Sequence, residues 1–90
     1  MLIQREKTPD FNSVTVRLMG DEYIIRGPDG PEYLAEIATK VETRLHKEQE
    51  ANPKLTKAQL AVLVALRLAD ELAKLQREHE EILRALAEAR

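Results

Sequence analysis

Residues 59–72, QLAVLVALRLADEL, are the feature that most restricts how this chain can fold. At about 100° per residue, the apolar side chains of this stretch point to almost every side of a helix. The large apolar residues of its first part include Leu60, Leu63, Val64, Leu66 and Leu68. The longest apolar run is far shorter than the roughly 18 residues that a membrane span requires. We therefore expect protein surfaces, and not lipid, to cover this helix.

The chain is too small to supply all of that cover. It has 90 residues and no cysteine, so disulfides do not stabilise it. Leaving two or three large apolar side chains in water forgoes about 1.5–3 kcal/mol each, a large share of a small domain's stability. A second copy of the chain, related by a two-fold axis, is the simplest cover. The sequence therefore predicts a homodimer with the five residues named above in its core.

The stretch SVTVRLMGDEYIIRG predicts a β-hairpin. Apolar residues alternate with polar ones at a period of two on both sides of Gly20-Asp21. Gly20 suits the first central position of a type II′ turn. In that register Leu18 faces Tyr23 and Val16 faces Ile25, which makes one side of the hairpin wholly apolar. Because a lone hairpin is marginal in water, this side is expected to lie on a helix.

Two helices follow the hairpin. Pro31 suits the first position of an amphipathic helix that ends before Pro53. Thr56 and Gln59 fit a capping box, and the residue before the cap, Leu55, is placed to pack on the next turn. No glycine or proline follows up to the end of the chain. These signals predict a second, much longer helix.

The fold class predicted is α+β, with three segments. Residues 1–12 are expected to be a flexible N-terminal tail. Residues 13–58, the hairpin and the shorter first helix, form a small dimerising head. Residues 59–90 form a long C-terminal helix, part of the dimer core to about residue 72 and a coiled coil beyond it. A helix of that length spans about 50 Å, whereas a compact chain of this size is about 30 Å across. The helix must therefore project from the head.

The coiled coil is predicted from a strip with alternating steps of four and three residues. After Leu68 the strip consists of Leu72, Leu75, His79, Ile82 and Leu86. This is the 3.5-residue period of a coiled-coil seam, although parallel and antiparallel pairing both remain open. His79 in the seam either fixes register or senses pH. The plainer interpretation, a histidine tolerated near the end of the coil, is favoured.

No set of residues indicates catalysis, a cofactor or a metal. His46 has Glu42 and Glu50 four residues away on either side, but with no cysteine or second histidine nearby a solvated helix surface is the better interpretation. The net charge of −2 and the three aromatic residues, Phe11, Tyr23 and Tyr33, argue against nucleic acid or an anionic membrane as partner. The expectation is a non-enzymatic cytoplasmic protein.

Basic residues gather around the predicted head and the turn between the helices. They are Arg17, Arg26, Arg44, Lys47, Lys54 and Lys57. Ordinary surface charge and a docking patch for an acidic partner protein are both compatible with this pattern, and a two-fold dimer would display such a patch twice.

The order of these parts is similar to that of the bacterial ZapA family of cell division proteins, particularly its short form. The resemblance runs from Val14 to about Ile82 and is carried by VTVRLMGDEY, by NPKL, and by the QLAVLVAL and ADEL segments. It implies a dimerising head, a coiled coil, and two dimers that join as a tetramer. It also implies binding to FtsZ, the tubulin-like division GTPase, and cross-linking of its filaments in the Z-ring at midcell during septation, with no cofactor or catalysis.

Two features depart from the family pattern. Asp21 and Glu22 follow the turn glycine where many relatives have a basic residue, so the hairpin tip is left out of the expected FtsZ contact. The predicted coil ends at Arg90, which leaves dimer and tetramer both open. FtsZ is acidic, so the six basic residues above are the contact candidates, chosen on charge and location. The alternative function is an oligomerisation or adaptor module for another coiled-coil partner.

Overall fold

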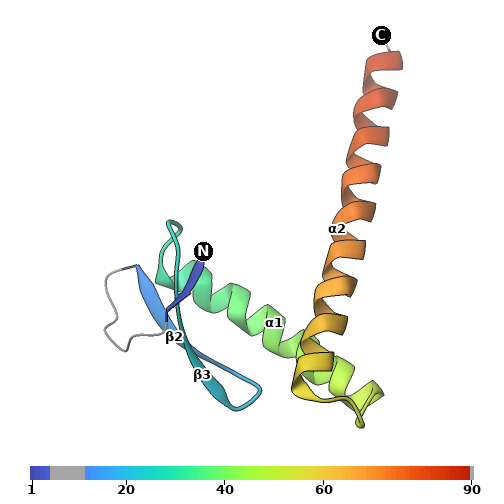
Figure 1. Cartoon of the computed structure of the whole chain (residues 1–90). Coiled ribbons are helices and arrows are strands. Elements are labelled where there is room, and N and C mark those ends of the chain that lie inside the picture. Colours follow the sequence, from blue (N-terminus) through green and yellow to red (C-terminus); the bar gives the residue numbers. More distant parts are fainter. Residues whose placement is uncertain (5–11, 90) are drawn as a thin grey trace.

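The computed structural model describes residues 1–4 and 12–89 and has the predicted α+β fold (Figure 1). A three-stranded antiparallel sheet has the order β1-β3-β2, and two helices follow it. The elements are β1 (Leu2–Gln4), β2 (Ser13–Leu18), β3 (Asp21–Arg26), α1 (Pro31–Ala51) and α2 (Lys57–Glu88). Helix α1 packs across the sheet, and α2 extends away from both (Figure 1). The predicted order of hairpin, helix and long helix is confirmed.

Strand β1 corrects the expectation of a flexible tail over residues 1–12. Residues 2–4 pair with β3, and Ile3 lies opposite Ile25. Three residues are too few to display an alternating pattern, so periodicity does not indicate this strand. Residues 5–11 of the expected tail lie outside the described residues.

The hairpin is present, but its predicted register is wrong by two residues. Val16 lies opposite Tyr23, and Leu18 lies opposite Asp21. The turn residues are Met19 and Gly20, with φ of 53° and 86°, as in a type I′ turn, which needs positive φ at both positions. Because the shift is even, every side chain keeps its predicted face, and the apolar side of the hairpin survives the error.

Contacts from α1 and α2 hold Met19 in this unusual conformation. Positive φ costs a non-glycine residue about 1 kcal/mol or more. In return, the backbone N–H of Met19 donates a hydrogen bond to Glu42 Oε2 on α1 at 3.0 Å. The Met19 side chain packs against the buried residues that join α1 to α2. These tertiary contacts displace the turn from the position that the glycine alone suggested.

The core consists of two separate clusters along α1. The first lies between the sheet and the start of α1 and contains Val16, Ile25, Leu34 and Ala38. The second lies where α1 meets α2 and contains Leu45, Leu60 and Val64. Leu34 and Leu60 are the most deeply buried side chains, with 1% and 0% of their surface exposed. The second cluster therefore attaches the long helix to the head.

The predicted helix ends are confirmed. Pro31 begins α1 after Gly30, and Asn52 caps its end before Pro53. At the start of α2, Thr56 Oγ1 accepts a hydrogen bond from the Gln59 backbone N–H at 3.1 Å. In a second hydrogen bond, Gln59 Oε1 accepts from the Thr56 backbone N–H at 3.0 Å.

Substituting Thr56 with alanine is expected to lower the free energy of unfolding by about 1 kcal/mol, because one backbone donor of the first turn loses its acceptor. Thr56→Ser keeps the hydroxyl and is the matched control. Urea denaturation followed by circular dichroism measures both. Equal stability of the two variants would mean that the Thr56 hydroxyl contributes nothing to folding.

The chain is elongated. Its Cα radius of gyration is 17.2 Å, with principal extents of 55 × 38 × 16 Å, whereas a compact chain of this length has a radius of gyration of about 12 Å. The second half of α2 accounts for the difference, because it extends from the head without touching it (Figure 1). The C-terminal end of the described chain therefore lies far from the sheet.

Candidate interaction surfaces

The head covers only one side of the first half of α2. Leu60 and Val64 are buried against α1, and Leu63 is half-buried. Val62 and Leu66, on other sides of the helix, expose 59% and 64% of their surface. Leu68, also placed in the predicted dimer core, exposes 39%. One chain therefore leaves uncovered much of the apolar surface that the sequence predicts to be buried.

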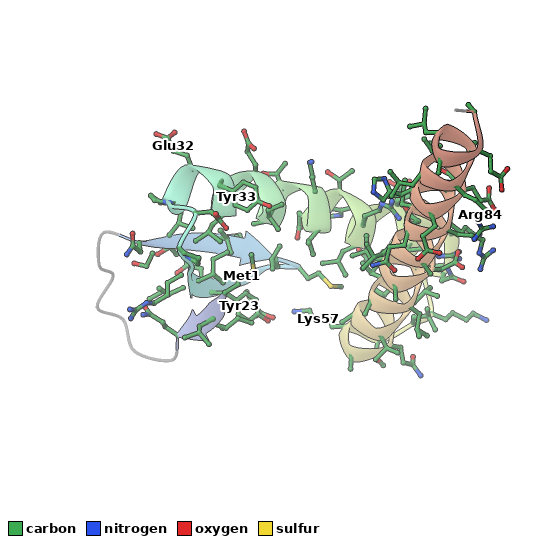
Figure 2. All side chains as sticks on the ribbon, turned by 90° about the horizontal axis from the view of Figure 1, so that it is seen from above. Met1, Tyr23, Glu32, Tyr33, Lys57 and Arg84 are labelled. Carbon is green, nitrogen blue, oxygen red and sulfur yellow. The ribbon has the colours of Figure 1, made fainter. Side chains whose placement is uncertain are left out.

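An apolar groove of about 480 Å³ lies beside that uncovered surface. It runs between the sheet, α1 and the first turns of α2. Its lining includes Ile3 and Tyr23 from the sheet, Val41 from α1, and Ala61 and Leu68 from α2. Figure 2 shows Tyr23 on the sheet and Lys57 between the hairpin tip and the start of α2. The groove and the exposed side of α2 together form one apolar surface.

The predicted coiled-coil strip is wholly exposed in a single chain. Leu72, Leu75, Ile82 and Leu86 expose 56%, 62%, 59% and 63% of their surface, and His79 is exposed among them. Figure 2 shows Arg84 on the side of α2 that faces away from the sheet. The strip is therefore free to contact another helix along its whole length.

The six basic residues that the sequence offers as contact candidates do not lie in one place. Arg17, near the hairpin tip, pairs with Glu22 at 2.9 Å. Lys57 pairs with Asp21 at 3.2 Å and so connects the start of α2 to the hairpin. Arg26 lies at the opposite end of β3, beside the connection to α1. Asp21 and Glu22 at the hairpin tip thus neutralise part of the positive charge of the candidate residues.

Lys47 and Lys54 are placed differently from the other candidates. Lys47 is in the last turns of α1 and Lys54 is in the turn between the helices. Both are exposed, and among the described residues neither has an ion-pair partner. They are the candidates best placed to meet an acidic partner.

Arg44, the remaining candidate, joins α1 to α2. Its two terminal nitrogens donate hydrogen bonds to the two carboxylate oxygens of Glu71. One turn away, Arg67 Nε on α2 lies 2.5 Å from Glu48 Oε1 on α1. We call these four residues the clasp. Hydrogen bonding with its partner holds the pKa of Glu71 below the ordinary carboxyl value and raises the pKa of Arg44.

Sequence reasoning missed the clasp as a unit. Arg44 and Glu48 are four residues apart on α1, and so are Arg67 and Glu71 on α2. The order of charge is the same on both helices, and the short turn between them folds the start of α2 back against the end of α1 (Figure 1). Opposite charges therefore meet at two successive turns. That pattern is present in the sequence, and it is recognisable once the start of α2 is known to lie against the end of α1 (Figure 1).

His46 has a structural partner. Its Nε2 lies 2.7 Å from Glu42 Oε1, and the same carboxylate accepts the Met19 hydrogen bond. Within residues 1–4 and 12–89 there is no group of three His, Cys, Asp or Glu side chains placed to hold a metal ion. Over the same residues, no helix has the length and apolar character needed to cross a membrane.

Comparisons with known proteins agree on one family. The family model "Cell division protein ZapA" matches residues 14–90. A cell division protein ZapA of Halalkalibacterium halodurans is 37% identical over 86 residues, which cover 96% of this chain and 90% of the relative. One of Shouchella clausii is 35% identical over 75 residues, covering 83% and 96%. A ZapA mutant dimer from Geobacillus stearothermophilus matches in structure, with a TM-score of 0.66, 30% identity, and coverage of 92% and 96%.

Proposed function

The chain belongs to the ZapA family of cell division proteins, and we propose that it binds FtsZ and cross-links FtsZ filaments in the cytoplasm at midcell, promoting Z-ring assembly. It acts as a structural protein, without catalysis and without a cofactor. The observation that carries the proposal is family membership over most of the chain. The exposed apolar surfaces support the assembly that a cross-linker needs.

The working unit proposed is a homodimer. The solved Geobacillus stearothermophilus relative is a mutant dimer, and this chain exposes apolar side chains on both halves of α2. In the dimer, the groove and the first half of α2 cover their counterparts in the second copy, while the exposed strip pairs as a coiled coil. A tetramer made of two dimers is the larger assembly compatible with the strip. Light scattering over a concentration series distinguishes the two.

The FtsZ contact is proposed on the basic residues of the head. Lys47 and Lys54 are its centre, because they are exposed and lack carboxylate partners among the described residues. The contact surface extends from these two lysines to Lys57 at the start of α2 and to Arg17 and Arg26 on the hairpin. A dimer presents each lysine twice, so that modest individual contacts add up when two filaments are bridged.

Co-sedimentation with polymerised FtsZ tests the function. The wild-type protein is expected to enter the pellet with FtsZ and to increase bundling. Changing Lys47 and Lys54 together to Glu is expected to weaken binding at least about tenfold, because attraction to an acidic surface becomes repulsion. Rising salt should weaken wild-type binding for the same reason.

The matched control is Lys40→Glu with Arg77→Glu, which makes the same change of charge at one exposed position on each helix, where the described residues include no ion-pair partner. Equal binding by the wild type, the Lys47/Lys54 variant and the control would reject the contact site. If the wild type fails to enter the pellet at any salt concentration, FtsZ binding is rejected. A tight partner that instead contacts residues 75–89 would identify the chain as an adaptor for another coiled-coil protein.

A further inference from the structure

The clasp differs from the other ion pairs described because its two pairs, on successive helical turns, both join α1 to α2. Glu48 is the most buried of its four members, with a side chain only 11% exposed. The Asn52 side-chain amide donates to the Glu48 backbone carbonyl at 3.2 Å, so a cap of α1 lies beside the clasp. In the other pair, the Arg44 guanidinium and the Glu71 carboxylate form a bidentate interaction with two hydrogen bonds, a geometry that fixes orientation as well as distance.

The position of the clasp along α2 is equally informative. Nearer the turn, Leu60 and Val64 hold α2 to α1 by apolar contact, which is non-directional. Beyond Glu71, every described residue of α2 is exposed. The clasp is therefore the last point at which the head touches the long helix.

We propose that the clasp sets the direction in which α2 leaves the head, and thereby the geometry of the cross-linker. The part about cross-linking rests on the function proposed above. From Glu71 to the end of α2 at Glu88 the helix extends about 25 Å, so a tilt of about 20° at the clasp moves its far end by roughly 9 Å. The separation between the FtsZ-binding heads of an assembly follows from that direction.

This role differs from a contribution to stability. Exposed ion pairs add little to the free energy of folding, and three of the four clasp side chains expose 35% to 52% of their surface. The buried Leu45, Leu60 and Val64 attach the helices whether or not the Arg44–Glu71 pair is formed. Breaking that pair should therefore leave a folded chain whose α2 points in a wider range of directions.

Distance measurement by pulsed electron spin resonance tests the proposal directly. The chain has no cysteine, so Glu36→Cys on α1 and Glu80→Cys on α2 take spin labels without competition. Dilution with unlabelled chains restricts the measurement to one protomer. Arg44→Glu or Glu71→Arg alone brings like charges together, and each is expected to widen the distance distribution to roughly twice that of the labelled parent. The double variant restores opposite charges and is expected to recover a narrow distribution.

Circular dichroism and light scattering establish that each variant is folded and assembled. If a charge-reversal variant does not fold or assemble, Arg44→Gln or Glu71→Gln takes its place. An unchanged distance distribution in folded single variants would overturn the proposal, as would a double variant whose distribution is as broad as those of the single variants.

None of these distance measurements requires FtsZ. If the wild type does not bundle FtsZ, the proposed function fails and the distances still decide the clasp. Where bundles form, electron microscopy is expected to show less regular filament spacing with Arg44→Glu, and unchanged spacing would remove the link to cross-linking.

Discussion

Replacing Leu60 with alanine is expected to lower the free energy of unfolding by about 2–5 kcal/mol. Leu60 has no exposed surface and packs with Leu45 and Val64, the residues that attach α2 to the head. The deleted atoms leave a cavity at this junction. Domains of this size have about 5–15 kcal/mol in total, so the variant should be close to the limit of stable folding.

Leu66→Ala is the matched control, because it removes the same atoms from a side chain that one chain leaves 64% exposed. Urea unfolding at several protein concentrations separates the two effects. Leu60→Ala should lower stability at every concentration. Leu66→Ala should act mainly by weakening association, so its effect should be near zero where the chains are monomeric and should grow to a plateau as concentration rises. If both variants were as stable as the wild type, the second core cluster would not hold α2 to the head.

The second large effect is expected from changing Leu75 and Ile82 together to Gln. Both belong to the exposed strip, and burying each side chain stabilises an assembly by about 1.5–3 kcal/mol. A loss of about 3 kcal/mol or more raises the dissociation constant for self-association more than a hundredfold. Sedimentation equilibrium measures this constant.

The control for this pair is Lys74→Gln with Glu81→Gln, one residue earlier at each position. It leaves the net charge unchanged and lies outside the strip, so the dissociation constant should move less than about threefold. A strip variant that associates as tightly as this control would show that α2 does not pair through these residues, and the proposed coiled coil would have to be abandoned.

Local signals predicted the helices well because each depends on a few neighbouring residues. Thr56 and Gln59 form the capping box that their spacing indicates, and Pro31 begins α1. The hairpin register was wrong because contacts from Glu42 and the second core cluster select the turn. Nothing within the hairpin reveals those contacts. Strand β1 was missed because it is too short to show a period.

The candidate interaction surfaces were predictable in part. The spacing of Leu72, Leu75 and Ile82 placed them on one strip of α2, and each is exposed in the single chain. The pairing of the basic residues was not predictable, because charge alone does not reveal which carboxylate lies beside each of them. Arg17 lies against Glu22 on the neighbouring strand of the hairpin, and Arg44 lies against Glu71 on α2. A basic residue is available to a partner only if the fold places no carboxylate beside it.

The order of charges in the clasp also favours one alignment of the two helices during folding. Sliding α2 by one turn along α1 in one direction would place Arg44 opposite Arg67, and in the other direction Glu48 opposite Glu71. Like charges repel at that distance, so both one-turn errors are penalised even where apolar side chains still meet. Misaligned helix pairs should therefore be short-lived. The chain then spends less time with the apolar half of α2 open to aggregation.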